Sequence, residues 1–368
     1  MDDTLVGFHR NVKEQYLLIK EQYAKMVNIG ESGITPVYRY VGMQITRNRE
    51  QRTINIRQTK YIEELAAEYK DEIEARETPH GVSKEQRQAF DQLKPAEGKD
   101  LIDKGKYLKM CGKIVWPATL TRPDISMQAS HLSSFTQSAG EPHYSWGLWI
   151  IGYLYKTKDL GITYGGRIRI PPGLSAKPAN FDDNGGLYII HDSSWGTRAR
   201  PLGGFIIMYL NGAIDWSAKA VKLVPDSTLE AEQAQASRAC KAGIAVRMLL
   251  RSARRKVIGP TPMLGDNKAY FDGVQQDGAT QRTRYYERAL LLVKRAVLLL
   301  IMVPFLIGTD SMTADILTKP LEKSAFMRHR TIMMNLNGGL RAGLESGLIG
   351  ASGSVRRVVE RLCDRAGW

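Results

Sequence analysis

Hydrophobic and polar positions follow a mainly helical pattern in the first half of this chain of 368 residues. Runs with helical spacing cover residues 12–27, 59–69 and, with a break at 121–124, most of 106–155. Two alternating runs, 38–47 and 53–58, predict a pair of strands around a charged turn. The polar stretch 71–100 predicts a loop, and the Gly- and Pro-rich stretch 165–180 predicts a linker.

After the linker, the pattern changes to that of a mixed sheet covered by helices. The predicted elements are a strand over 186–192, a hairpin over 203–219 turning at Asn211-Gly212, a helix over 227–250 capped by Ser227, and a strand and turn over 261–267. The apolar run 296–308 is too short to span a bilayer and predicts a strand buried on both faces. This order of elements predicts an α/β unit.

Four acidic residues fall at one edge of this predicted unit. Asp192 and Asp266 end two strands that we expect to be neighbours, Glu232 lies one turn into the long helix, and Asp315 lies in the first turn of the last helix. Asp310 is expected to cap that helix. Four carboxylates at one edge repel each other unless cations lie between them, and oxygen ligands suit Mg²⁺ or Mn²⁺. Each acid taken singly also fits a solvated turn or a surface charge, so the joint placement carries the metal-site hypothesis.

The formal net charge of +14 suggests a polyanionic partner, and nucleic acid is the first candidate. A basic surface that only keeps the protein in solution is the alternative. The basic residues expected to contact phosphates are Arg251, Arg254, Arg255, Lys256, Arg282 and Arg284. A solvated charged face explains the same residues without a ligand.

The three cysteines, Cys111, Cys240 and Cys363, are widely spaced and form neither a disulfide framework nor a zinc motif. This usage fits a reducing intracellular compartment, cytoplasmic or nuclear. The opening "MDDTLVGFHR" is not a signal peptide, and no membrane partner is expected.

Several sequence blocks resemble a known family. In the first half they are "YRYVGMQI", "INIRQTKYIEEL", "YLKMCGKIVWPATLTRPDI" and "HYSWGLWIIGYLYKTKDLGITY"; in the second they are "HDSSWG", "STLEAEQ", "GDNKAY" and "TADILTKPL". In order and place they resemble the C-terminal part of the Pol polyprotein of copia-type long-terminal-repeat retrotransposons, from residue 1 to about residue 335. The resemblance implies an RNase H-like mixed β-sheet covered by helices, preceded by a mainly helical reverse transcriptase region.

The resemblance also implies a site and an activity. Asp192, Glu232, Asp266 and Asp315 correspond to the acids that bind two Mg²⁺ (or Mn²⁺) ions, and Glu232 rather than Glu230 matches the second acid of the family's "EAE". The implied reaction is hydrolysis of the RNA strand of an RNA–DNA hybrid. The implied parts are a palm remnant and thumb start (1–70), a thumb and connection region (71–165), a linker (166–185), an RNase H-like domain (186–335) and a Gly- and Arg-rich tail (336–368).

The N-terminal "MDDTLV" resembles the polymerase "YVDD" motif, which makes Asp2 and Asp3 vestigial polymerase ligands. Polymerase chemistry also needs an earlier aspartate and the fingers, so we expect no DNA synthesis by this chain alone. Two departures from the family concern the nuclease: Ser194 replaces a frequent second acid, and Tyr285 replaces the usual histidine, which predicts slow turnover.

The leading hypothesis is therefore a retrotransposon-derived ribonuclease H, a hydrolase. The alternatives are a catalytically idle remnant that still binds nucleic acid and a non-functional product that folds poorly. No pattern in the sequence indicates an oligomeric state.

Overall fold

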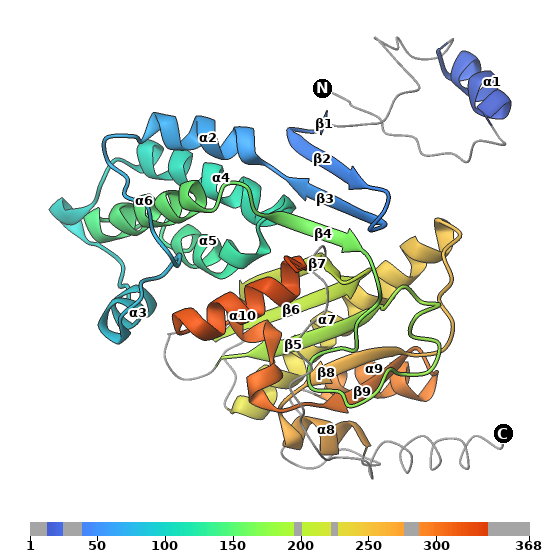
Figure 1. The fold of residues 1–368 in the computed structure, drawn as a ribbon. Coiled ribbons are helices and arrows are strands. Elements are labelled where there is room, and N and C mark those ends of the chain that lie inside the picture. Colours follow the sequence, from blue (N-terminus) through green and yellow to red (C-terminus); the bar gives the residue numbers. More distant parts are fainter. Residues whose placement is uncertain (1–12, 25–38, 195–200, 222–226, 276–286, 338–368) are drawn as a thin grey trace.

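The computed structural model describes residues 13–24, 39–194, 201–221, 227–275 and 287–337. Figure 1 shows two β-sheets, with most of the upstream helices beside the first and the later helices around the second. Among the described residues, no helix is long and apolar enough to cross a membrane.

The first sheet is antiparallel and has the order β1-β2-β3-β4. Its strands are β1 (Arg39–Tyr40), β2 (Met43–Asn48), β3 (Thr53–Arg57) and β4 (Gly161–Gly165). The predicted hairpin is confirmed as β2 and β3. The strand β4 was not predicted, because it is short and its pairing is not local: Asn55 lies opposite Thr163.

The helices of the first half are α1 (Lys13–Ala24), α2 (Thr59–Glu68), α3 (Lys84–Asp91), α4 (Lys104–Leu120), α5 (Ser126–Ser133) and α6 (Glu141–Lys156), with short 3₁₀ turns η2 (Gly98–Asp100) and η3 (Pro123–Ile125). The expectation of a loop over 71–100 was wrong, because this stretch contains α3. A capping box begins that helix: Ser83 Oγ accepts a hydrogen bond from the Gln86 backbone N–H at 3.2 Å, and Gln86 Oε1 accepts one from the Ser83 N–H at 3.1 Å.

The second sheet is mixed and confirms the predicted α/β class. Its strands are β5 (Tyr188–Ser193), β6 (Leu202–Tyr209), β7 (Gly212–Ala220), β8 (Thr261–Gly265) and β9 (Met302–Leu306). The order is β7-β6-β5-β8-β9; β5, β6 and β7 are antiparallel, whereas β8 runs parallel to both β5 and β9. The hairpin turns one residue earlier than predicted, at Leu210-Asn211: both residues have positive φ, as a tight two-residue turn requires, and Tyr209 lies opposite Gly212. This is the RNase H-like sheet that the resemblance implied.

Four helices accompany this sheet: α7 (Thr228–Ser252), α8 (Lys268–Gln275), α9 (Glu287–Leu298) and α10 (Lys323–Met334). Helix α7 lies close to β5 at Gly243, where an added Cβ would be 2.3 Å from Ile189 Cδ1. The prediction of one strand over 296–308 was partly wrong. Helix α9 continues to Leu298, the chain reverses at Leu300 with φ of 52°, and only Met302–Leu306 forms a strand.

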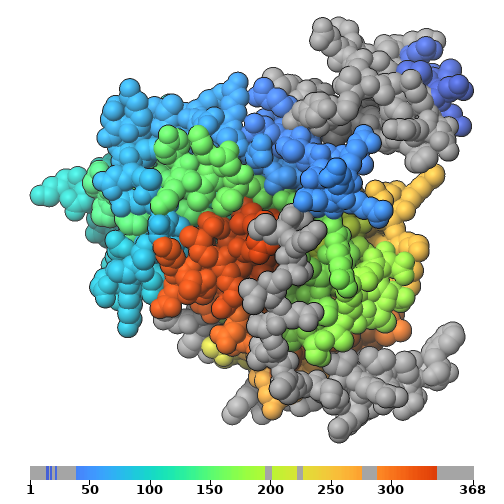
Figure 2. Space-filling view, in the orientation of Figure 1, coloured from blue at the N-terminus to red at the C-terminus, as the bar shows by residue number. Residues whose placement is uncertain are grey.

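Two apolar clusters form the core. One lies between the second sheet and helices α7, α8 and α9. The other is continuous from Tyr107 and Tyr153 of the upstream helices, through Ile190 and Ile206 of the second sheet, to Phe326 of α10. In Figure 2 the orange-red atoms of α10 lie against the blue and green atoms of the upstream helices. The core therefore crosses the predicted linker at 166–185, and the division into domains stays a prediction.

Candidate active site

Two of the predicted acids lie at the ends of neighbouring parallel strands. Asp192 is the fifth residue of β5, and Asp266 comes directly after β8. Ile190 of β5 lies opposite Leu264 of β8, so the register places Asp192 beside Asp266 at the carboxyl edge of the sheet. Asp192 is buried and Asp266 is half-buried. The sequence predicted this pairing, because both acids end strands whose limits the hydrophobic pattern gives.

Glu232 is held at the end of β5. The Ser193 backbone N–H and hydroxyl both donate to Glu232 Oε1, at 3.1 and 2.9 Å. Helix α7 begins one turn earlier, where Ser227 Oγ accepts a hydrogen bond from the backbone N–H of Glu230, so the predicted cap is present. Glu232, which belongs to α7, is buried, and its carboxylate is close enough to Asp192 for the charge of Asp192 to raise its pKa.

Asp315 comes to the edge on a 3₁₀ turn, η6 (Thr313–Leu317), which contacts β5 and β6. The residue after this turn, Thr318, donates from Oγ1 to Asp192 Oδ2 at 2.5 Å. Asp315 is therefore not in the first turn of the last helix, because α10 begins only at Lys323.

The expectation that Asp310 caps this segment was also wrong. Asp310 lies in a separate 3₁₀ turn, η5 (Thr309–Ser311), and is exposed. The residue before η6 is Met312, which makes no side-chain cap hydrogen bond. Two short turns replace the single helix start that the sequence pattern suggested.

The carboxylates interact electrostatically. Burial first, and then the nearby charge of Asp192, raises the pKa of Glu232 to about 8 and the pKa of Asp315 to about 7. The same two causes raise the pKa of Asp266, although a hydrogen bond from Thr309 Oγ1 at 3.1 Å opposes them. The acids at this edge therefore repel one another, as carboxylates placed close together do.

Lys319 is a member of the site that the sequence reasoning missed. Its Nζ lies 2.9 Å from Asp315 Oδ2, at the i,i+4 spacing that brings helical side chains together. Burial lowers the pKa of Lys319, but attraction to Asp315, Asp192 and Asp266 outweighs burial and raises it overall. The signal available in the sequence was the spacing in "DILTK".

The donors at this edge suit a hard divalent cation, since they are carboxylate oxygens. Asp315 Oδ1 is buried without a hydrogen-bond partner, which leaves an acceptor free for a ligand. Within the described ranges, however, no three His, Cys, Asp or Glu side chains are close enough to form a ready-made metal site. The acids share an edge, and Lys319 provides the positive charge beside Asp315.

The basic residues predicted to contact nucleic acid lie elsewhere. Arg251, Arg254, Arg255 and Lys256 are exposed at the C-terminal end of α7 and just beyond it. At 1.5 Å per residue, Arg251 lies about 28 Å along the helix from Glu232. Lys256 pairs with Asp183 at 3.1 Å. The structure does not bring these residues to the acids, and their binding role stays a prediction.

Some of the predicted residues cannot be placed. Asp2, Asp3, Arg282, Arg284 and Tyr285 lie outside the described residues, as does the tail from residue 338 onward.

Comparison with known proteins gives the relationship of the chain. No family model matches it. It is 27% identical over 236 residues to the retrovirus-related Pol polyprotein from transposon TNT 1-94 of Nicotiana tabacum, a match that covers 63% of this chain and 16% of that protein. It is 25% identical over 224 residues to the putative transposon Ty5-1 protein of Saccharomyces cerevisiae, covering 60% of this chain and 66% of that one. The chain is related to retrotransposon Pol polyproteins.

The resemblance seen in the sequence motifs is thereby confirmed, at modest identity. The Pol-related chain spans less than two thirds of the length of either relative. Among solved structures, RNase H1 from the halophilic archaeon Halobacterium salinarum NRC-1 matches 36% of this chain and 93% of its own, with 14% identity and a TM-score of 0.27. A TM-score this low does not establish a shared fold. The description of the second sheet as RNase H-like depends on its strand order, given above.

Proposed function

We propose that this retrotransposon Pol relative is a ribonuclease H that hydrolyses the RNA strand of RNA–DNA hybrids. The observation that supports the proposal is the placement of Asp192, Glu232, Asp266 and Asp315 along the carboxyl edge of an RNase H-like sheet. They come from two strands, a helix and a 3₁₀ turn, and no local requirement of any of these elements brings four acids together.

Two Mg²⁺ or Mn²⁺ ions would be held by these four acids. Such ions supply Lewis acidity and a reactive water at neutral pH. The protein's own groups orient the carboxylates: Ser193 fixes Glu232 Oε1, and Thr318 fixes Asp192 Oδ2. Burial and the nearby charge of Asp192 raise the pKa of both Glu232 and Asp315, and bound cations would relieve this repulsion.

The upstream residues are proposed to correspond to the reverse transcriptase region of the Pol relatives. In this proposal residues 1–70 correspond to the palm and thumb start, 71–165 to the thumb and connection, and 186–335 to the RNase H-like part. The hybrid would be recognised by its shape and its 2′-hydroxyl groups rather than by its sequence.

A second candidate function is binding of nucleic acid without cleavage. It is favoured by the position of Lys319 Nζ, 2.9 Å from Asp315 Oδ2, and by the lack of a closed three-residue metal group in the described part of the chain. A lysine that stays beside this acid would oppose cation binding there.

A cleavage assay tests both functions. A labelled RNA–DNA hybrid is incubated with the full chain in Mg²⁺ and then in Mn²⁺, beside Glu232→Gln and Asp266→Asn. Asp310→Asn is the matched control, because Asp310 is an exposed acid close to Asp315 in the sequence and the proposal does not assign it to the metal site. We expect metal-dependent cutting of RNA only, abolished in the two site variants and retained in the control. A folded chain that binds the hybrid and cuts nothing would leave the binding function.

A further inference from the structure

The chain segment that follows Asp315 is held by residues from the first half of the chain. His80 Nε2 donates to the Leu321 carbonyl oxygen at 2.8 Å, and Lys323 forms an ion pair with Glu77. Helix α10 then contacts β4, β7 and η3 as well as η6 itself. The position of the Asp315 segment therefore depends on more than the sheet that carries the other acids.

A buried ion pair in the "TRPD" block lies at the centre of this contact. Arg122 donates to both oxygens of Asp124, from Nε at 2.9 Å and from Nη2 at 2.8 Å, and both side chains are completely buried. Arg122 also donates to the carbonyl oxygen and hydroxyl of Thr157, at 3.1 and 2.7 Å. These bonds join η3 to the C-terminal end of α6.

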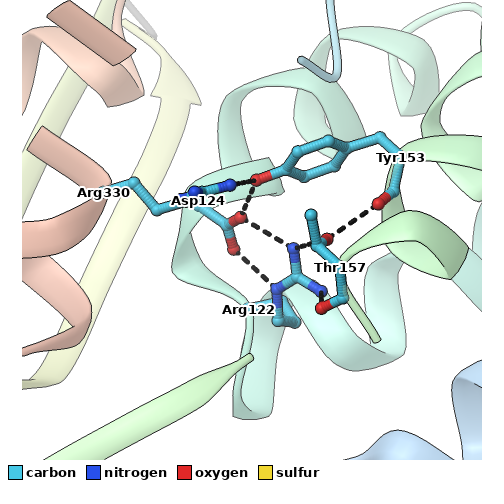
Figure 3. Close-up of polar contacts among 5 residues, drawn as sticks. All are labelled: Arg122, Asp124, Tyr153, Thr157 and Arg330. Carbon is cyan, nitrogen blue, oxygen red and sulfur yellow. Dashed lines mark hydrogen bonds and ion pairs between the residues drawn. The ribbon is translucent and has the colours of Figure 1, made fainter. Parts of the chain in front are cut away.

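Tyr153 extends the pair to helix α10. Its hydroxyl donates to Asp124 Oδ2 at 2.5 Å and accepts a hydrogen bond from Arg330 Nη1 at 2.9 Å (Figure 3). The same ring lies edge-on to Phe326 at 5.8 Å between centroids. One hydroxyl group thus links the upstream ion pair to an arginine of α10.

Helix α10 is in turn tied to the turns before it. Arg328 Nη2 donates to the Asp310 carbonyl oxygen in η5 at 3.0 Å. Arg330 therefore connects α10 to the upstream helices, and Arg328 connects it to η5, the turn that precedes the one carrying Asp315. Displacement of α10 would be transmitted to η5 and η6 through these bonds.

Stability alone is a weak explanation for this arrangement. Replacing a buried ion pair by apolar residues of the same volume often costs no stability, and in some proteins such a pair is retained because it specifies one geometry. Here the ion pair lies within the upstream helices, and the hydrogen bond from Arg330 to Tyr153 connects it to the second half of the chain.

We propose that Tyr153 and Arg330 are positioning residues of the nuclease, which hold α10 so that Asp315 stays at the carboxyl edge of the sheet. The inference rests on the proposed ribonuclease function for its catalytic meaning. According to this inference, the "TRPD" block and α6 help to position Asp315, although neither contributes an acid to the site.

Hydrogen–deuterium exchange of the full chain without divalent metal tests the positioning directly. Tyr153→Phe keeps the ring and removes the link, and Arg330→Met removes the other partner. Tyr107→Phe is the matched control, because its fully buried hydroxyl donates to the Leu132 carbonyl oxygen at 2.8 Å within the same core. We expect peptides covering 309–321 to exchange about tenfold faster in the first two variants, from the loss of one buried hydrogen bond, and at the original rate in the control.

A second measurement connects the contact to the activity. In the cleavage assay, Tyr153→Phe should raise the Mn²⁺ concentration needed for half-maximal cutting several-fold, and Arg330→Lys should restore part of what Arg330→Met loses. Exchange needs no activity, so a chain that never cuts still reports on the positioning. Unchanged exchange at 309–321 in Tyr153→Phe would overturn the inference. Equal acceleration throughout α7 and the sheet would also overturn it, since that indicates general loosening.

Discussion

Acid should destabilise this protein through His80, and the size of the effect follows from the contacts of its ring. His80 is buried, Nε2 donates to the Leu321 carbonyl oxygen at 2.8 Å, and Nδ1 lies 2.7 Å from Gln128 Nε2, from which it accepts. A proton added to Nδ1 would point at the Gln128 N–H. Burial first, with Arg87 nearby, lowers the pKa of His80 to about 4.

The folded state therefore binds this proton less readily than the unfolded state, in which a histidine has a pKa of about 6.5. The contribution of His80 to stability is complete above that pH and is lost as the pH falls toward 4. A difference of this size corresponds to a loss of about 2 kcal/mol at pH 5 relative to pH 8.

Urea unfolding of the native chain and of His80→Gln, at pH 8 and at pH 5, measures the effect. The glutamine keeps an N–H donor for Leu321 and does not titrate, so the other histidines and the acids cancel in the comparison. We expect the native chain to lose about 2 kcal/mol more than the variant between the two pH values. Equal losses in both proteins would refute the assignment of a neutral His80 to the folded state.

Three further predictions concern the core and the site. Asp124→Asn should lower the free energy of unfolding by about 3–5 kcal/mol, measured in urea, because it leaves Arg122 buried without its partner charge. Gly243→Ala should lower it by about 1–3 kcal/mol, since the new Cβ would lie 2.3 Å from Ile189 Cδ1. Lys319→Met should lower the melting temperature in a metal chelator, because the nearby acids lose their attractive partner.

Each of these has a clear contrary result. Gly112→Ala in α4 is the control for the glycine, because nothing lies within 4 Å of the added Cβ, and it should stabilise by up to about 1 kcal/mol. Equal effects at Gly112 and Gly243 would contradict the packing described for α7. An unchanged melting temperature for the lysine variant would mean that its contact with Asp315 is not formed in solution. A loss below about 1 kcal/mol for the Asp124 variant would show that this pair is solvated.

The sequence was sufficient for the second sheet and for the pairing of Asp192 with Asp266 at its edge. The hydrophobic pattern and the Asn-Gly signal located the hairpin of β6 and β7, with the turn one residue too late, and strand ends then place Asp192 and Asp266. The limits of α7 were predicted within two residues, because Ser227 and the alanine-rich pattern mark them. Helix caps, alternation and turn signals each depend on a few neighbouring residues, so the sequence alone is enough to predict them.

What the sequence could not give depends on contacts between distant residues. The strand β4 pairs with β3 across more than a hundred positions, as Asn55 and Thr163 show. A continuous apolar run does not distinguish a helix end from a strand, so the boundary at Leu298 was missed. The spacing in "DILTK" could indicate the pairing of Lys319 with Asp315, but the position of this pair beside Asp192 follows from how η6 packs on the sheet.

The continuous core shared by the upstream helices and α10 has a consequence for synthesis of the protein on the ribosome. Helix α6 ends at Lys156, whereas α10, which covers Tyr153 and completes its hydrogen bonds, begins only at Lys323. The upstream helices must therefore wait for most of the remaining chain before their apolar surface is covered. We expect the growing chain to need protection by chaperones during this interval. We also expect the two halves to fold together, in one late cooperative step after the chain is complete.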